Sequence, residues 1–228
     1  MYLTAILLAA GRGARFKSKT PKPLVKIDSL PVIIHSLSAL SKNPYVSEII
    51  VTVNRRNAPG IKECIKRHRI RKVKRIVLGG RRRQDSVSNA LKFIGPQIKL
   101  VLIHDAARPF IDKNIISRVI KQAAGCGAAV AGIPVKATIK EVRSQIVAKT
   151  LKRNNLWEIQ TPQVFKKDLI LKAYRRFNRL DATDDATLVE RLGKKVCVVR
   201  GCYTNLKITT SEDLAVAKAI AGMRKYGI

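Results

Sequence analysis

The sequence predicts an α/β protein: a Rossmann-like three-layer sandwich with a mostly parallel mixed sheet and a projecting β-arm. Two observations predict the layers. Apolar β-type runs alternate with helical patterns up to residue 133, and the runs are almost continuously apolar, as in strands covered on both faces. A third observation predicts the arm, because the alternation stops after Pro134 and residues 136–161 form short charged segments. A length of 228 residues suits one domain over 1–228, with the arm at about 136–161.

Each predicted element follows from its local pattern. Five apolar runs predict strands over Leu3–Ala9, Glu48–Val53, Lys74–Leu78, Lys99–His104 and Ala128–Ile133. Between them, four patterns predict helices over Pro31–Leu40, Ile61–His68, Gln84–Phe93 and Asn114–Ala124, the last capped by Asp112. Beyond the arm we expect helices over Lys167–Phe177 and Asp184–Leu192, and strands over Lys195–Val199 and Asn205–Ile208. Ser211 is expected to cap a last helix, with Glu212 and Asp213 at its positive end.

Positive charge is the most unusual feature of the composition. The chain has 46 Lys and Arg against 15 Asp and Glu, a net charge of +31. A charge excess of this size attracts nucleic acids, but it also favours small anionic substrates. The basic residues are scattered along the chain without a separate tail, and aromatic residues that could stack on bases make up only 5%. We therefore expect no specific nucleic acid partner, and a basic RNA-binding protein that reuses the fold stays as an alternative.

The cysteines and the apolar runs indicate where the protein works. The four cysteines have no metal-binding spacing, and a core of this size does not need disulfides. No apolar run approaches the roughly 20 residues of a membrane span. The first residues lack a basic region and lead directly into a glycine loop, which indicates a first strand and not a signal peptide. These features predict a cytoplasmic protein with reduced thiols and no membrane association.

A glycine loop follows the first expected strand, in Leu8-Ala9-Ala10-Gly11-Arg12-Gly13-Ala14-Arg15. Small residues let the backbone come close to a ligand, and exposed N–H groups can bind phosphate. The third glycine of a dinucleotide-binding loop and the Lys-Ser/Thr pair of a P-loop are both missing. Arg15 and Lys22 place two cations nearby. Fixed cations suit phosphoryl or nucleotidyl transfer, because they stabilise the negative charge of the transition state.

An acid follows the fourth expected strand, in Asp105-Ala106-Ala107-Arg108-Pro109. Ligands of open α/β sheets bind beyond the carboxyl ends of the strands, so Asp105 would lie opposite the glycine loop. A single carboxylate beside a triphosphate is typical of Mg²⁺ sites. A helix cap or an ion pair with Arg108 would also account for this acid. For His104, next to it, we expect a structural role.

Together these motifs resemble a known enzyme family. The loop Leu8-Ala9-Ala10-Gly11-x-Gly13-x-Arg15 with Pro21-Lys22 is similar to the signature of sugar-phosphate nucleotidyltransferases. Three further motifs narrow the resemblance: Gly79-Gly80-x-x-Arg83-Gln84-x-Ser86-Val87, His104-Asp105-Ala106-Ala107-Arg108-Pro109 and Gln160-Thr161-Pro162-Gln163. This ordered set resembles the 2-C-methyl-D-erythritol 4-phosphate cytidylyltransferases of the non-mevalonate (MEP) isoprenoid pathway. The resemblance runs from Leu3 to about Ala219.

The resemblance implies a reaction and a set of site residues. The phosphate of methylerythritol phosphate would attack the α-phosphorus of CTP, with Mg²⁺ required, to give 4-diphosphocytidyl-2-C-methyl-D-erythritol and pyrophosphate. Arg15 and Lys22 would stabilise the transition state, and Asp105 would hold the metal. The cytidine part of CTP would be bound by Ala9, Ala10, Gly11, Gly80, Arg81, Ser86 and Ala106. Methylerythritol phosphate would be bound by Thr138, Arg153, Lys207 and Arg108.

The resemblance also implies a homodimer in which the arms at 136–161 interlock and reach the partner's active site. Three residues depart from the family, because Ala137, Lys152 and Thr204 stand where an acid is common. All three departures remove negative charge, in the same direction as the composition of the whole chain. Asp184 and Asp185 would cap a helix near the site or act in catalysis.

A related family of similar fold, the ribitol 5-phosphate cytidylyltransferases, is the nearest alternative. Those enzymes tend to have a second glycine where Ala10 stands and a bulkier residue where Ala107 stands. They also lack the arm pattern Arg153-x-x-Leu156-Trp157. The sequence therefore favours methylerythritol phosphate as the acceptor.

Overall fold

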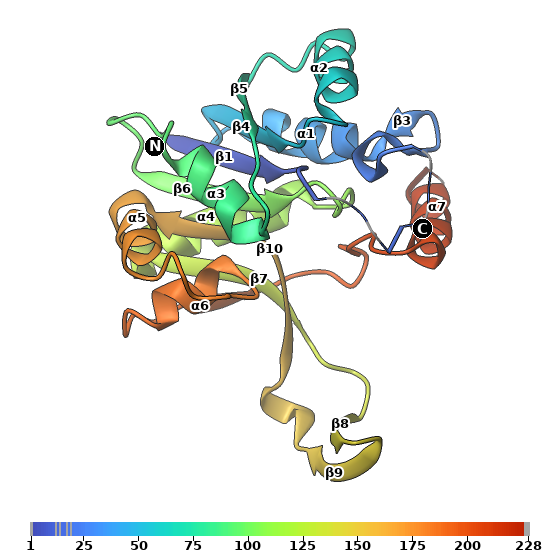
Figure 1. Cartoon of the computed structure of the whole chain (residues 1–228), viewed down its shortest axis with the longest axis vertical. Coiled ribbons are helices and arrows are strands. Elements are labelled where there is room, and N and C mark those ends of the chain that lie inside the picture. Colours follow the sequence, from blue (N-terminus) through green and yellow to red (C-terminus); the bar gives the residue numbers. More distant parts are fainter. Residues whose placement is uncertain (1, 12, 14, 17, 19, 226–228) are drawn as a thin grey trace.

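A seven-stranded sheet lies at the centre of the computed structural model, which describes residues 2–225 apart from 12, 14, 17 and 19 (Figure 1). Arg12 and Ala14 of the glycine loop thus lie outside the described residues. The strands, in the order β11-β7-β10-β6-β1-β4-β5, are Cys197–Arg200, Ala128–Pro134, Trp157–Lys166, Leu100–Asp105, Leu3–Leu8, Glu48–Val53 and Val73–Leu78. Only β10 is antiparallel to its neighbours, β6 and β7. The predicted mostly parallel mixed sheet is confirmed.

Helices cover both faces of this sheet and make three layers. On one face lie α1 (Val32–Lys42), α2 (Ala58–Arg67) and α4 (Lys113–Cys126). On the other lie α3 (Arg83–Leu91), α5 (Lys167–Arg176) and α6 (Asp185–Glu190). Successive side chains of a strand point to opposite faces, so along β1 Leu7 enters the first core and Ile6 the second. This explains why the central strands are apolar without interruption.

The last helix, α7 (Ser211–Lys225), lies beside the small hairpin of β2 (Lys26–Ile27) and β3 (Leu30–Pro31). Ala217 and Ala221 of α7 form a third apolar cluster with Phe16 and Ile208. This cluster fixes the chain after β1 against the chain before α7. Both stretches carry predicted site residues.

Helix caps follow the sequence, with one correction. Asp112 caps α4 as predicted, because its side chain accepts hydrogen bonds from the first backbone N–H groups of the helix. The prediction that Ser211 caps α7 is wrong, since Ser211 is the first residue of that helix. Thr210 is the cap: its hydroxyl accepts from the backbone N of Asp213 at 3.4 Å, and Asp213 accepts from the backbone N of Thr210 at 3.0 Å.

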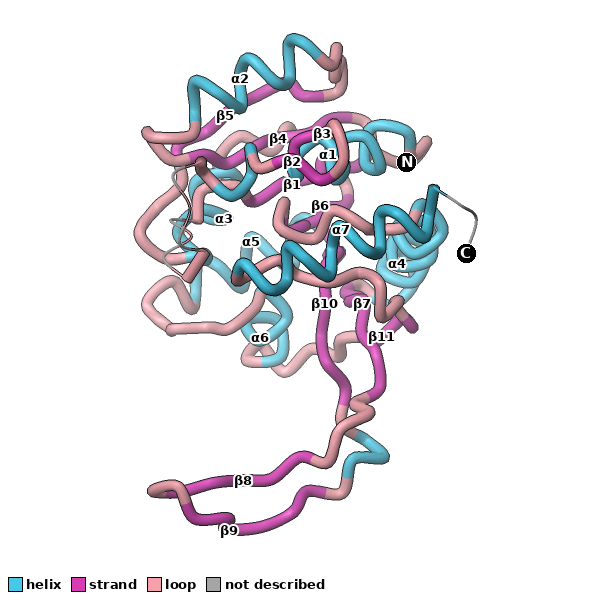
Figure 2. Tube along the Cα trace, turned by 90° about the vertical axis from the view of Figure 1, so that its right-hand side faces the viewer, coloured by secondary structure: helices cyan, strands magenta, loops and turns pink. Residues whose placement is uncertain are grey.

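The arm is a hairpin of β8 (Ile139–Arg143) and β9 (Ile146–Leu151), followed by the short 3-10 helix η2 (Arg153–Asn155). It projects well away from the sheet (Figures 1 and 2). The predicted end of the arm at residue 161 is too late. Trp157 already pairs with Pro134, and β10 continues between β6 and β7 to Lys166. The sequence pattern missed this strand because Pro162 and several polar residues interrupt its apolar character.

Residues 205–208, all described, form no strand, contrary to prediction. They cross the carboxyl edge of the sheet, and the N–H of Ile208 donates to the carbonyl of Ala107 at 2.8 Å. Among the residues that the structure describes, no neighbouring strand runs alongside them to form a ladder. The backbone of this segment serves instead as a support for side chains of the cleft described below.

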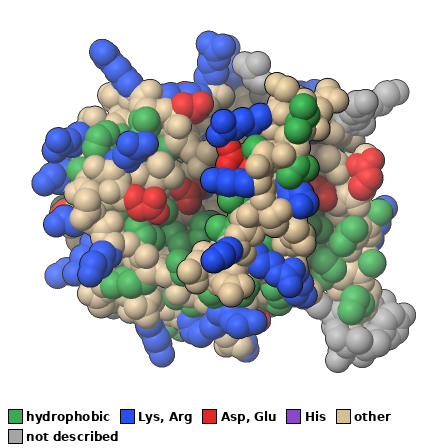
Figure 3. All heavy atoms as spheres, turned by 90° about the horizontal axis from the view of Figure 1, so that it is seen from below, with side chains coloured by type: hydrophobic (Ala, Val, Ile, Leu, Met, Phe, Trp, Pro, Cys, Tyr) green, Lys and Arg blue, Asp and Glu red, His purple; other side chains and the backbone are tan. Residues whose placement is uncertain are grey.

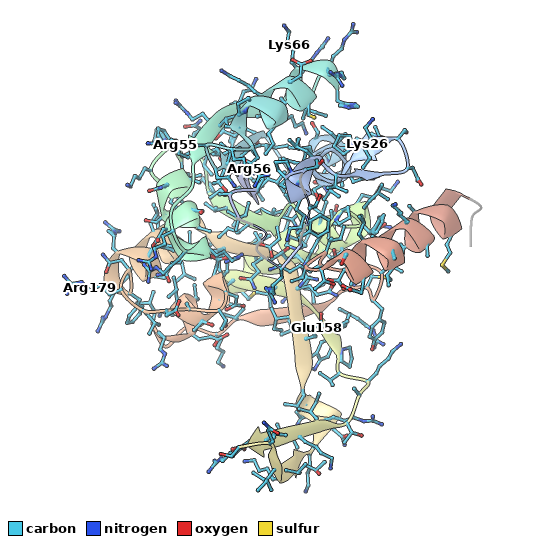
Figure 4. All side chains as sticks on the ribbon, turned by 45° about the vertical axis from the view of Figure 1, so that its right-hand side comes forward. Lys26, Arg55, Arg56, Lys66, Glu158 and Arg179 are labelled. Carbon is cyan, nitrogen blue, oxygen red and sulfur yellow. The ribbon has the colours of Figure 1, made fainter. Side chains whose placement is uncertain are left out.

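Charged side chains are spread over the molecule. Figure 3 shows Lys and Arg along the left and lower edges and across the middle of the face seen from the arm side. In Figure 4, Lys26, Lys66 and Arg179 project from three separate parts of the fold, whereas Glu158 lies at the root of the arm. On the views shown, the charge does not gather in a single patch. None of the helices built from described residues is long and apolar enough to cross a membrane.

Candidate active site

A cleft of about 620 Å³ opens where β1, β4, β5 and β6 end. Leu8 is paired with Asp105 in the parallel register of β1 and β6, so the glycine loop and the acid leave the sheet side by side. Most of the predicted site residues line this cleft: Ala9, Ala10, Gly11, Lys22, Gly80, Arg81, Ser86, Asp105, Ala106 and Lys207. The rule that ligands bind at the carboxyl ends of parallel strands therefore located the cleft correctly.

One wall of the cleft consists almost entirely of backbone and small side chains. A Cβ on Gly79 would lie 2.3 Å from the Cβ of Ala10 and 2.6 Å from the hydroxyl of Ser86, so no larger residue fits there. The backbone N of Gly80 donates to Ser86 Oγ at 3.1 Å, which joins the end of β5 to the start of α3. Such a wall presents peptide groups at close range, as recognition of a flat base requires.

Two asparagines that the sequence interpretation missed fix the glycine loop. Asn54 Nδ2 donates to the carbonyl of Ala10 at 3.0 Å, and Asn57 Nδ2 donates to the carbonyl of Ala9 at 2.8 Å. The two asparagines also bond to each other, because each side-chain oxygen accepts from the other's backbone N at 2.9 Å. The Asn54-x-x-Asn57 spacing directly after a strand is the signal that could have indicated them.

Asp105 is held between two cations. Arg83 Nε lies 3.2 Å from Asp105 Oδ1, and Lys207 Nζ lies 2.6 Å from Asp105 Oδ2. Burial alone would raise the pKa of this carboxyl. The positive charges of Arg83 and Lys207 outweigh it and hold the pKa of Asp105 well below its usual range. The carboxylate is thus ionised across the physiological range.

The donor set fits one kind of divalent ion. Among the described residues there is no group of three or more His, Cys, Asp or Glu that could hold a metal by itself. An ion here would depend on one carboxylate, Asp105, together with oxygens of a bound nucleotide. That combination is the one Mg²⁺ favours, since it keeps several waters and binds through one or two carboxylates plus phosphates. Lys207 would have to leave Oδ2 first.

Lys22 lies in the same cleft as Asp105 and Lys207. Its Nζ donates to the carbonyl of Ile208 at 3.0 Å. Burial, and then the charge of Lys207, lower the pKa of Lys22, and the charge of Arg15 acts in the same direction. Arg15 itself is exposed and is not part of the cleft lining. Three cations therefore influence one small region beside the glycine loop.

Three further predicted residues lie outside the cleft lining. Thr138 and Arg153 are exposed on the arm, where Arg153 Nη1 donates to the carbonyl of Lys136. Arg108 is buried, and its Nη1 donates to the carbonyl of Asn205 at 2.7 Å. Within one chain, the arm residues are therefore not brought together with the cleft.

His104 belongs to a buried hydrogen-bond chain behind Asp105. Its Nε2 faces the carbonyl of Arg108 at 3.1 Å and must carry the proton. Its Nδ1 then accepts from Thr161 Oγ1 at 2.9 Å, and that hydroxyl accepts from the backbone N of Asp105 at 3.1 Å. Burial lowers the pKa of His104 to about 4, so the ring is neutral. This arrangement is structural, as expected from the sequence.

Comparison with known proteins agrees with this geometry. The family model for 2-C-methyl-D-erythritol 4-phosphate cytidylyltransferase matches residues 3–223. Proteins of that name from Shouchella clausii and Bacillus cereus are 41% and 40% identical over 227 and 224 residues. These matches cover 99% and 97% of this chain, and 99% of each relative.

A solved structure shows the same fold. The crystal structure of 4-diphosphocytidyl-2C-methyl-D-erythritol synthase from Anaerococcus prevotii has a TM-score of 0.86 at 31% identity. The match covers 97% of this chain and 96% of that one. Sequence and fold thus agree over almost the whole length. The chain belongs to the 2-C-methyl-D-erythritol 4-phosphate cytidylyltransferase family, whose members are nucleotidyltransferases.

Proposed function

We propose that the protein transfers CMP from CTP to 2-C-methyl-D-erythritol 4-phosphate in the MEP isoprenoid pathway. A phosphate oxygen of the acceptor bonds to the α-phosphorus of CTP. The bond from that phosphorus to the bridging oxygen breaks, and pyrophosphate leaves. The observation that carries this proposal is the cleft itself, because a wall of backbone and small residues meets Lys22, Lys207 and Asp105 at one end. Such a wall suits a pyrimidine base, and the charged end suits phosphates.

In this proposal Arg15 and Lys22 stabilise the transition state. Charge accumulates on the oxygens of the α-phosphorus, and fixed cations act on it without reorganisation. The hydrogen bond from Lys22 to the carbonyl of Ile208 supports this role, since it fixes the ammonium group beside the glycine loop. A phosphate nucleophile is already ionised at neutral pH, so no general base is needed.

The cytidine part of CTP is proposed to lie against the small-residue wall. The residues involved are Ala9, Ala10, Gly11, Gly80, Arg81, Ser86 and Ala106, all of which line the cleft. Gly79 and Ala10 place little side-chain volume in the cleft, which supports close approach of a flat base to the backbone there.

A divalent ion, for which we propose Mg²⁺, is assigned to Asp105. When bound with the triphosphate, the ion would neutralise phosphate charge. Asp105 supports this assignment because it is ionised and lies at the phosphate end of the cleft. Lys207, once released from Asp105, is then free to bind the phosphate of the acceptor.

The acceptor site is proposed to be completed by a second copy of the chain. Thr138 and Arg153 do not line the cleft of their own chain, so we assign them to the partner's cleft in a homodimer joined through the arms. Exposed apolar side chains on the arm support this, since Val142, Ile146 and Val147 are 53%, 74% and 52% exposed. Arg108 would contribute to the acceptor site indirectly, because its hydrogen bond to the carbonyl of Asn205 holds the segment that carries Lys207.

We further propose that residues 1–228 act as one domain in the cytoplasm. The three apolar clusters lie around one sheet and its edge, which supports a single domain. All four cysteines are free, which suits a reducing compartment.

Release of pyrophosphate by the purified protein tests the function. CTP and Mg²⁺ are supplied with either methylerythritol phosphate or ribitol 5-phosphate as acceptor. We expect release with the first and none with the second. Pyrophosphate release with ribitol 5-phosphate alone would show that the proposed acceptor is wrong. No release with either acceptor would favour the RNA-binding alternative.

A further inference from the structure

Arg83 joins the carboxylate of the cleft to the second carboxylate of Asp185, for which the sequence suggested a helix cap or a part in catalysis. Its Nε lies 3.2 Å from Asp105 Oδ1, and its Nη1 lies 2.8 Å from Asp185 Oδ2. The guanidinium is planar and rigid, so two partners on different nitrogens fix both its position and its orientation. Arg83 is therefore held in place even if its contact with Asp105 changes.

Asp185 is well suited to be the fixed end of this arrangement. Its side chain is completely buried at the start of α6. Its Oδ1 accepts a hydrogen bond of 2.5 Å from the hydroxyl of Tyr174 on α5. Gln163 of β10 accepts hydrogen bonds from the backbone N of Asp185 and of Ala186, both at 3.2 Å. Burial and the adjacent carboxylate raise the pKa of Tyr174, so its phenol keeps the proton that it donates.

The two oxygens of Asp105 consequently differ. Oδ1 faces Arg83, whose side chain is 26% exposed and anchored on Asp185. Oδ2 faces Lys207, whose side chain is 44% exposed and has a long flexible stem. One cation is fixed and the other can exchange. Oδ2 is therefore the oxygen available to a ligand, and Arg83 keeps Oδ1 occupied.

We propose that Asp185 is a positioning residue that acts through Arg83, so that Asp105 offers a single oxygen to a divalent ion. This inference rests on the proposed function of Asp105. Single-oxygen coordination favours Mg²⁺, which needs near-ideal octahedral geometry, over Ca²⁺, which accepts carboxylates through both oxygens. Tyr174 holds the other carboxylate oxygen of Asp185. Its contribution to positioning Arg83 is smaller, because removing the Tyr174 hydroxyl leaves the Asp185–Arg83 ion pair intact.

The variant Asp185→Asn tests the proposal. It preserves the shape of the side chain but removes the charge that anchors Arg83. The matched control is Asp184→Asn, which removes the neighbouring charge. Asp184 caps α6 by accepting from Thr187, and it accepts from Gln163 Nε2 at 2.7 Å, but among the described contacts it does not touch Arg83. Both variants change one acid at the same helix end, so a general loss of packing affects both.

Binding of Mn²⁺ in the presence of CTP, without acceptor, is measured by electron paramagnetic resonance, and Mg²⁺ and Ca²⁺ are used as competitors. For Asp185→Asn we expect Mg²⁺ to bind roughly 10- to 100-fold more weakly, the usual effect of removing a residue that orients a metal ligand. The affinity for Ca²⁺ should fall much less, so the preference for Mg²⁺ over Ca²⁺ should become smaller. Tyr174→Phe should change the preference in the same direction but less.

Asp184→Asn should leave the metal preference unchanged while lowering the thermal midpoint of unfolding. The proposal would be overturned if Asp185→Asn and Asp184→Asn bound Mg²⁺ with equal affinity. It would also be overturned if Asp185→Asn preferred Mg²⁺ over Ca²⁺ as strongly as the wild-type protein does. Because the measurement needs no acceptor, it remains informative if pyrophosphate release shows that the proposed acceptor is wrong. Absence of any Mn²⁺–CTP binding by the wild-type protein would instead refute the assignment of Asp105.

Discussion

Lys207 Nζ and Asp105 Oδ2 lie 2.6 Å apart at the phosphate end of the cleft, so a lysine occupies the carboxylate oxygen that we assign to a divalent ion. The two residues come from distant segments, and both have proposed roles with phosphates. Their pairing neutralises charge before ligands arrive. It also implies that the metal and the lysine compete for the same oxygen.

Replacing Lys207 should therefore strengthen metal binding while it weakens acceptor binding. For Lys207→Ala we expect Mg²⁺, in the presence of CTP, to bind about threefold more tightly. The reason is that Mg²⁺ no longer has to break the partly exposed Lys207–Asp105 ion pair, which is worth about 0.5–1 kcal/mol. The KM for methylerythritol phosphate should rise. Titration calorimetry measures the first effect and steady-state kinetics the second. Lys207→Arg, which keeps the charge, is the control, and weaker Mg²⁺ binding by Lys207→Ala would contradict the competition.

Lys22 should matter for turnover more than for nucleotide binding. We expect Lys22→Ala to lower kcat by about 100-fold or more, the effect of removing one preorganised stabilising group. The Kd for CTP, measured by calorimetry, should rise by less than the fall in kcat. Lys26→Ala serves as the control, because Lys26 is an exposed lysine of the nearby hairpin. A kcat near that of the wild type would show that Lys22 does not stabilise the transition state.

Arg153 should act on the acceptor alone. For Arg153→Ala we expect the KM for methylerythritol phosphate to rise about tenfold or more, as for loss of a charge-assisted hydrogen bond to phosphate. The KM for CTP should stay within about twofold, because Arg153 is on the arm and not in the cleft. The adjacent Lys152→Ala variant controls for the change in arm charge. Equal effects on both substrates would show that the arm does not capture the acceptor.

Gly79 should tolerate no side chain. In Gly79→Ala the new Cβ would meet the Cβ of Ala10 at 2.3 Å, and neither atom can move without its backbone. We expect a loss of about 1–3 kcal/mol in unfolding free energy from this overpacking, together with weaker CTP binding. Chemical denaturation and calorimetry measure the two effects. Gly125→Ala in α4, where a Cβ meets nothing within 4 Å, should leave both unchanged or slightly increase stability.

The buried ring of His104 should make folding stability depend on pH. Burial lowers its pKa from 6.5 to about 4 in the folded protein. The unfolded state therefore binds more protons between these values, and stability present above pH 6.5 is lost as the pH falls toward 4. The loss reaches roughly 3 kcal/mol. Urea denaturation of the metal-free protein at several pH values measures how the unfolding free energy depends on pH. His104→Gln should make this dependence weaker between pH 4 and 6.5. If the dependence is unchanged in His104→Gln, other titrating groups cause it.

The sequence predicted the frame of the fold and the position of the cleft. Leu3–Ala9 and Lys99–His104 were recognised because strands buried on both faces are apolar without interruption, and parallel strands place Ala9 and Asp105 at one edge. The motifs indicated the family for the same reason. Glycines and small residues beside a phosphate are required locally, so they leave a local pattern.

Several features depended on long-range contacts and left little local signal. The strand β10 is interrupted by Pro162 and becomes a strand because it fits between β6 and β7. Residues 205–208 have a strand-like pattern but pair with no strand in the described part of the chain. The Arg83–Asp185 pair depends on how α3 and α6 are placed on the same face of the sheet, which no spacing in the sequence encodes.

Local chemistry thus determined which residues can bind a nucleotide, because turn geometry, burial and charge type are properties of short segments. Only the tertiary structure decided which charges neutralise one another. Ion pairs such as Lys207–Asp105 depend on distances of a few ångströms and on burial, and both arise when distant segments converge at one edge of the sheet. In a chain with 46 basic residues, sequence alone does not distinguish the few cations that act on the cleft from those that lie in solvent.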